Sequence, residues 1–442
     1  MAQQASPNPI PGSSPTPVFT QKTILQYKPF RTMWLAQFVS IFGDFLALFG
    51  VISLITFKLH GNAVQVTAVT IAYVLPLALI SPVAGVFVDH WNVKRVMILS
   101  DVSRAVLIIL LIFVTDVAQI CVIFALLSAV ASFFAPAQSV TLRTLVPMDG
   151  LLAANAMMTQ AFYVVRLASP FAAGALIAAT GEHFCFWLDT FSFLFSAFMI
   201  STLVIVRPPR AKQEKTLEAL TQDFLEGNKF IFTHAGLAFV FVAMAVAMFV
   251  LSSFSPLISI YIRDSLGAGP FIFGVISSMV GIGLIAGSQM LTRGSLAFNR
   301  SGEGSSSTDT KKNAPKTNVV LAGLAALGMG AALLGAFRDI PMAALATFTM
   351  GFAISFVLVP AQTMSQQETP PAMIGRVSST FMSLISLAQV LGLLLSGYLA
   401  RALGIRPLFM ASAAVLALIA GGGYWMMRGR VITGQQQEQA AG

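Results

Sequence analysis

The stretch RTMWLAQFVSIFGDFLALFGVISLITFK, residues 31–58, decides the fold of this chain. A helix that crosses a hydrocarbon layer of about 30 Å needs about 20 mostly apolar residues, and this stretch exceeds that length. One acid, Asp44, interrupts it near the middle. A charge at that depth costs about 2.5–3.5 kcal/mol on the mildest scale, so it is kept where it faces a bundle interior or cavity and has a partner. The stretch therefore predicts a membrane helix within a bundle of several helices.

The composition of the whole chain agrees with this interpretation. Of its 442 residues 56% are hydrophobic and 10% are charged, and the mean hydropathy is +0.82. A soluble domain carries about 25% charged residues. The net charge of +9 is explained by basic loops on the cytoplasmic side of a membrane protein, so we expect no nucleic-acid partner. Cys121 and Cys185 form neither a disulfide framework nor a metal-binding spacing, so we expect no metal and no cofactor.

Hydropathy divides the chain into twelve spans, six in each half. Several gaps between spans are very short, so consecutive spans must be antiparallel neighbours. This predicts an all-α membrane protein with twelve transmembrane helices in two six-helix halves around a central cavity. The expected spans are 31–58, 64–88, 95–115, 117–140, 151–180, 184–206, 237–262, 270–292, 318–336, 340–364, 377–400 and 407–427. The expected domains are a disordered cytoplasmic tail (1–30), an N-terminal bundle (31–206), a cytoplasmic linker (207–236), a C-terminal bundle (237–427) and a cytoplasmic tail (428–442).

The distribution of Lys and Arg predicts that both termini are cytoplasmic. In that orientation most of the 26 basic residues lie on the cytoplasmic side, as the positive-inside rule requires. We therefore expect a multi-pass protein of the plasma membrane. The basic residues on the opposite side are then Lys58, Arg263, Arg338, Arg401 and Arg406, while Arg104 and Arg166 lie within spans.

The two halves also repeat each other. The segment PAQS at 136–139 ends the fourth span, and PAQT at 360–363 ends the tenth. Duplicated halves around a cavity at the membrane midplane are typical of many secondary transporters.

The loop between spans two and three, GVFVDHWNVKR at 85–95, resembles the major facilitator superfamily pattern G-x-x-x-D-R-x-G-R-R. Gly85, Asp89 and Lys94 match, and Arg95 lies one place beyond the pattern. Asn92 replaces a Gly of the pattern, which we interpret as a mild change because Asn tolerates a left-handed turn. The segments DVSR at 101–104 and IGRV at 374–377 resemble the macrolide-efflux-like and siderophore-exporter-like branch.

The resemblance implies a role for this loop as a cytoplasmic gate. In the family the loop reaches the start of span eleven, here near Arg376. Asp89 at a helix end can meet the positive N-terminus of a neighbouring helix, which contributes about 0.3–1 kcal/mol. We therefore expect Gly85, Asp89, Lys94, Arg95 and Arg376 to latch the two halves. The alternative is a turn that serves only topology through its basic residues.

Candidates for proton coupling or substrate binding lie in the N-terminal half. Gln37 shares a face of span one with Asp44, and Asn155 shares a stripe along span five with Arg166. We predict that Asp44 carries the driving proton, because Arg stays protonated, and that Arg166 sets its proton affinity or receives an anionic part of the solute. The alternative is a buried structural ion pair. Asp101 and Arg104 are spaced as a local pair, and Asp189 either functions or simply reaches the outer interface.

These observations predict a monomeric secondary transporter that uses alternating access, with protons, a small-molecule substrate and membrane lipid as its partners. The leading function is proton-driven export of a hydrophobic or amphipathic compound. The segment AQFVSIFGD at 36–44 also resembles the first span of lysophospholipid transporters, which leaves a lipid substrate as an alternative. A receptor or scaffold that transports nothing is a third possibility. A P-loop pattern and a nucleophile constellation are absent from the sequence, so we expect neither an ATPase motor nor an enzyme.

Overall fold

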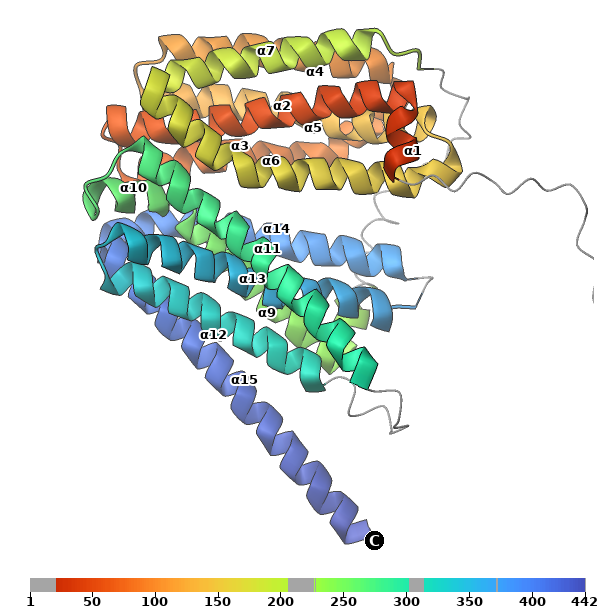
Figure 1. The fold of residues 1–442 in the computed structure, drawn as a ribbon, viewed down its shortest axis with the longest axis vertical. Helices are drawn as coiled ribbons and strands as arrows, with labels where there is room; N and C mark the ends of the chain where they lie inside the picture. Colours follow the sequence, from red (N-terminus) through yellow and green to blue (C-terminus); the bar gives the residue numbers. More distant parts are fainter. Residues whose placement is uncertain (1–20, 206–225, 227, 302–313, 371–372, 442) are drawn as a thin grey trace, which may run out of the picture.

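The computed structural model of the chain describes residues 21–205, 226, 228–301, 314–370 and 373–441 (Figure 1). Within these ranges twelve helices are long and apolar enough to cross a membrane. Helices suit this environment because a helix satisfies its backbone N–H and C=O groups internally, where lipid offers no partner. The protein is an all-α membrane protein with twelve membrane-spanning helices, as hydropathy predicts.

Six spans form the N-terminal half, which lies above the C-terminal half in Figure 1. In it α2 packs against α6 and α7, while α4 packs against α5 and α7 and α3 against α5. Its elements are α1 (Gln21–Gln26), α2 (Lys28–Ser53), the π-helix η1 (Leu54–Lys58), α3 (Ala63–His90), α4 (Val93–Leu110), η2 (Leu111–Phe113), α5 (Val117–Leu145), η3 (Met148–Gly150), α6 (Leu151–Thr180) and α7 (Glu182–Ser201).

The C-terminal half repeats this plan. Here α13 packs between α11 and α12, α12 also contacts α15, and α9 contacts α14. Pro136 lies inside α5 and Pro360 inside α13, so the repeated segments occupy the fourth and tenth spans. The elements of this half are α9 (Ala235–Phe254), α10 (Leu257–Asp264), α11 (Pro270–Ser301), α12 (Ala314–Ala336), α13 (Ile340–Glu368), α14 (Ile374–Leu403) and α15 (Ile405–Ala441).

The two halves meet mainly along two helix pairs, α3 with α14 and α6 with α11, and α10 also contacts η1 and α3. The second pair approaches closely at Gly174 and Gly274. A Cβ atom on Gly274 would lie 2.8 Å from the Cα atom of Gly174, and one on Gly174 would lie 3.0 Å from the backbone oxygen of Pro270. Side chains at these two positions would therefore force the halves apart.

The structure differs from the expected boundaries most clearly at span seven and at the two ends of the chain, and α11 continues to Ser301, past the expected end of span eight at 292. Span seven is not continuous: α9 ends at Phe254, and α10 starts after Pro256, which cannot donate a backbone hydrogen bond within a helix. Helix α1 lies within the expected N-terminal tail, and α15 continues through the expected C-terminal tail. Residues 1–20 and most of the linker at 207–236 fall outside the described residues.

Asn92 has a different role from the one its sequence position suggested. It does not form a left-handed turn, since its φ is −72°. Its side chain instead caps α4 by accepting a hydrogen bond of 3.1 Å from the backbone N–H of Arg95. Asn is among the preferred N-cap residues because its oxygen satisfies a backbone donor that the helix leaves free.

Candidate functional site

The core of the N-terminal half brings three acids close to one arginine. Asp44 lies on α2, Asp101 and Arg104 lie on α4, and Asp189 lies on α7. We call these four residues the acidic cluster. Helices α2 and α4 both pack against α7. This packing brings the four polar side chains together inside the N-terminal half.

Arg104 is the common partner within the cluster. Its Nη2 donates a hydrogen bond to Oδ1 of Asp101, one helical turn earlier, so the predicted local pair is confirmed. Its Nη1 lies 3.6 Å from Oδ2 of Asp44. The guanidinium also lies over two aromatic rings, 4.2 Å from the centroid of Phe193 and 4.7 Å from that of Phe134. Cation–π contact is strengthened by the loss of water, so these rings help to hold a buried Arg104.

The acids of the cluster differ in their access to solvent. The side chain of Asp44 is 33% exposed, whereas those of Asp101 and Asp189 are fully buried. Asp189 therefore does not reach an interface, and that alternative from the sequence is wrong. Asp44 is the only one of the three acids whose carboxyl group combines partial exposure with the ion pair to Arg104.

Gly43 allows α7 to approach α2 at the cluster. A Cβ atom at this position would collide with the Ser192 hydroxyl and with Oδ1 of Asp189. Because Gly43 has no side chain, Asp189 can lie against α2 at the residue that precedes Asp44. A cavity of about 20 Å³ lies beside them, lined by Asp44, Tyr73, Arg104 and Asp189 together with apolar side chains. This volume is enough for one water molecule.

The sequence-predicted partners of Asp44 are not joined to it. Within the described residues, the structure gives Asp44 an ion pair with Arg104, and it gives Arg166 no ion pair. The side chain of Arg166 is exposed on α6. Gln37 is buried with its Nε2 unpaired, and the Nδ2 of exposed Asn155 donates to the backbone oxygen of Leu151 at 2.8 Å. Arg104 therefore occupies the place beside Asp44 that the sequence suggested for Arg166.

The predicted cytoplasmic gate is described only in part. The Nζ of Lys94 donates to the backbone oxygen of Leu203 at 2.7 Å, which ties the start of α4 to the end of α7 within one half. A Cβ atom on Gly85 would meet nothing within 4 Å, so packing in this conformation does not require glycine there. The side chains of Asp89 and Arg376 lie outside the described part of the chain, and the latch between them stays a prediction.

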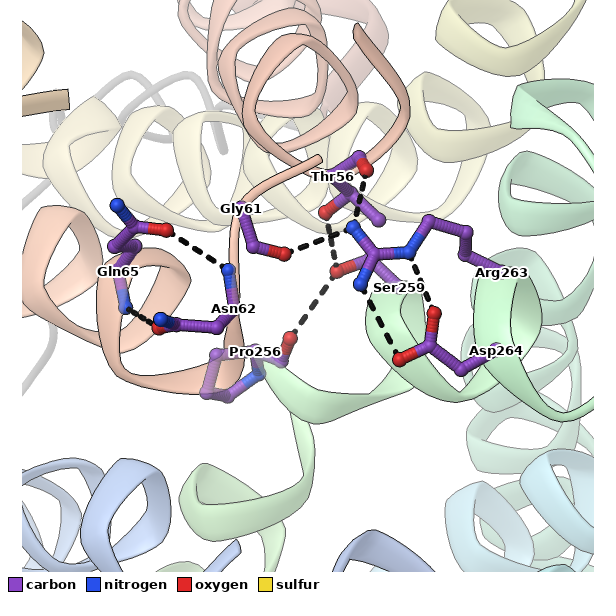
Figure 2. A network of polar contacts seen from close by, with 8 residues as sticks. All are labelled: Thr56, Gly61, Asn62, Gln65, Pro256, Ser259, Arg263 and Asp264. Carbon is purple, nitrogen blue, oxygen red and sulfur yellow. Dashed lines mark hydrogen bonds and ion pairs between the residues drawn. The ribbon is translucent and has the colours of Figure 1, made fainter. Parts of the chain in front are cut away.

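A second polar network joins the two halves at one end of the molecule, which carries η1, the start of α3 and α10. We call it the α10 end. Figure 2 shows Arg263 of α10 reaching across to the N-terminal half, where its Nη1 donates to the backbone oxygens of Thr56 at 2.6 Å and Gly61 at 2.8 Å. The hydroxyl of Thr56 donates to that of Ser259 at 2.9 Å. We call Arg263, Thr56, Gly61 and Ser259 the Arg263 clamp.

Neighbouring groups orient the clamp. Arg263 forms a bidentate pair with Asp264, with distances of 2.6 Å and 3.2 Å, which fixes the plane of the guanidinium. Asn62 and Gln65 form a capping box that starts α3 directly after Gly61 (Figure 2). Sequence reasoning missed the clamp, because Arg263 was visible only as a loop charge. Two features of the sequence could have indicated the clamp: Pro256, which breaks span seven, and the adjacent charges of Arg263 and Asp264.

The similarity of this chain to known proteins extends over nearly its whole length. The family model of the Major Facilitator Superfamily matches residues 33–307 and 310–440. The uncharacterized MFS-type transporter YfiS of Bacillus subtilis (strain 168) is 27% identical over 400 residues, covering 89% of this chain and 91% of that protein. The multidrug efflux pump Tap of Mycolicibacterium fortuitum is 24% identical over 372 residues, covering 81% and 86%.

Two further comparisons, one with a curated relative and one with a solved structure, also show similarity to transporters. Macrolide efflux protein A of Streptococcus pyogenes is 22% identical over 405 residues, covering 88% of this chain and 94% of that protein. Among solved structures, a bacterial homologue of the human lysosomal transporter Spinster, in an inward-facing and unoccupied conformation, aligns with a TM-score of 0.67. It is 13% identical and covers 94% of this chain and 97% of that chain, so this likeness concerns the fold.

Proposed function

Because the chain belongs to the major facilitator superfamily, as the family model matched over both halves shows, we propose that this transporter exports a hydrophobic or amphipathic small molecule in exchange for protons. Two relatives named as efflux proteins, the pump Tap and macrolide efflux protein A, support the direction and the class of solute. The expected location of this transporter is the plasma membrane, and the positive-inside rule supports an orientation with both termini in the cytoplasm. The solute and membrane lipid are its expected partners, and the transporter works as a monomer.

The observation that carries the coupling proposal is the state of Asp44. Its carboxylate is paired with Arg104 at 3.6 Å, yet it keeps one third of its side-chain surface exposed. A nearby Arg favours the ionised acid and burial favours the neutral one, so a change in the surroundings of Asp44 changes its affinity for a proton. Asp44 therefore binds and releases the driving proton, and Arg104 sets that affinity. Arg166, exposed on α6, remains our candidate for an anionic part of the solute.

Alternating access supplies the change in surroundings. The Arg263 clamp holds the halves together at the α10 end, where Gly174 and Gly274 also pack closely. Opening that end breaks the clamp, and closing the other end engages the loop that carries Asp89. In the predicted orientation the α10 end faces outward, so the Arg263 clamp closes the outward side of the transporter.

Reconstituted transport tests the proposal. Proteoliposomes with an imposed pH gradient should accumulate a macrolide or a lipophilic cationic dye against its gradient, and a protonophore should stop the accumulation. Asp44→Asn should abolish this uphill transport and spare part of the downhill exchange. The matched control is Asp149→Asn, which replaces an exposed acid in η3 and should behave as wild type.

Three outcomes contradict parts of the proposal. Uphill accumulation by Asp44→Asn at the wild-type rate places the proton carrier elsewhere. Transfer of a labelled lysophospholipid without transport of macrolide or dye favours the lipid alternative. A protein that moves none of these probes contradicts the proposed class of solute and favours the receptor or scaffold alternative.

A further inference from the structure

Asp189 is a buried acid without a counter-charge of its own. Its side chain is 0% exposed. The Ser192 hydroxyl donates to Oδ1 of Asp189 at 3.0 Å, and Oδ2 has no hydrogen-bond partner among the described residues. Asp189 also lines the water-sized cavity that it shares with Asp44 and Arg104. An ionised carboxylate in this position would carry an unpaired charge in an apolar interior, where the loss of hydration strongly disfavours the ionised form.

The charges around the cavity do not supply the missing partner. Helix α4 contributes Arg104, whose single positive charge already faces both Asp101 and Asp44. Helix α2 contributes Asp44, which would repel a second carboxylate, and α3 contributes the phenol of Tyr73. The cavity side chains from α5 are Phe124, Leu127 and Ala131, all apolar. Three ionised acids would leave the interior with two negative charges in excess.

A proton fits this site better than a metal ion does. Hard divalent cations take about 6–8 oxygen ligands, and the cavity has room for about one water molecule. The guanidinium of Arg104 lines the same cavity and would repel any metal cation placed there. A proton needs only one carboxyl oxygen, and Oδ2 of Asp189 is free to hold it.

We propose that Asp189 is a second proton-binding residue, which holds a proton on Oδ2 while Asp44 is paired with Arg104 and passes it to Asp44 through the shared cavity. In that step the O–H bond at Asp189 breaks, an O–H bond at Asp44 forms, and one negative charge moves from Asp44 to Asp189. Asp44 thereby loses its attraction to Arg104 and can release the proton to solvent through its exposed surface. The use of this proton in transport rests on the proposed function, whereas its presence on Asp189 does not.

Infrared spectroscopy of the purified full-length protein in detergent tests the site with protons alone. At neutral pH the wild-type protein should show the C=O stretch of a protonated carboxyl group that exchanges slowly in heavy water. Asp189→Asn should remove that band. Ser192→Ala should keep the band and shift its frequency, because it removes the hydrogen bond to Oδ1. Asp149→Asn, whose acid is exposed, should leave the band unchanged.

The outcomes separate this inference from the proposed function. A band that is the same in Asp189→Asn and wild type overturns the assignment. If Asp189→Asn does not yield folded protein, a band that Ser192→Ala leaves unshifted overturns it instead. Loss of the band on adding sodium at constant pH identifies a metal cation as the ligand and also overturns it. A wild-type protein that shows the band but transports neither macrolide nor dye contradicts the proposed function alone. Uphill transport by Asp189→Asn at the wild-type rate overturns the transfer step.

Discussion

Replacing Arg263 with glutamine should weaken the closed state of the α10 end. The change removes two hydrogen bonds from a charged donor to the backbone oxygens of Thr56 and Gly61, at 2.6 Å and 2.8 Å. A hydrogen bond to a charged group contributes about 1.5–3 kcal/mol. The Arg263 side chain is 21% exposed, so water replaces part of this energy when the clamp opens. We therefore expect the closed state to lose about 2–3 kcal/mol, which shifts the ratio of open to closed molecules by about 30- to 150-fold.

Pulsed electron paramagnetic resonance can measure this shift as a distance distribution. Spin labels at Ala118 and Arg338, both exposed, mark the two halves near the α10 end. The buried Cys185 and the half-buried Cys121 are first replaced, so that only the introduced cysteines react. Arg263→Gln should add or enlarge a population with a longer distance between the labels.

The matched control is Arg401→Gln. Arg401 is also exposed and lies near the end of α14, whose Gly397 packs against the start of α3. If Arg263→Gln and Arg401→Gln give the same distance distribution as the parent protein, the clamp does not stabilise the closed state and the reasoning fails.

Three further predictions follow from the helix contacts and the topology. Gly274→Val should keep the α10 end from closing, because a Cβ atom there would lie 2.5 Å from the backbone oxygen of Pro170 in α6, which is a collision, and the same spin labels should report a longer distance. Asp89→Asn should slow transport without reducing the amount of protein in the membrane, and equal transport at equal protein level rejects the latch. Cysteine labels at Asn62 and Ala268 should react from outside intact cells, and labels in 301–313 only after permeabilisation. If labels in 301–313 react from outside intact cells, the predicted orientation of the protein in the membrane is wrong.

The sequence alone determined the class and plan of the protein. A bilayer leaves a spanning backbone few options, so each long apolar stretch such as 31–58 had to become a helix. The repeated PAQ segments marked the duplicated halves, and the loop at 85–95 marked the family. Even the i, i+3 pair of Asp101 and Arg104 followed from helical spacing, because both residues lie on one helix and their separation is fixed by its geometry.

Only the tertiary structure decided which charges on different helices meet. Asp44 was visible from its depth in the first span, but its partner was not, since Arg104 and Arg166 both lie within spans of the same half. The packing of α2 and α4 against α7 selected Arg104, and Gly43 let Asp189 join the cluster. The clamp likewise depends on the backbone oxygens of Thr56 and Gly61, and an acceptor on the backbone gives no residue-type signal in the sequence. Such contacts arise between residues about 60 to 200 positions apart in the chain, whereas hydropathy and helical period describe only neighbours within one helix.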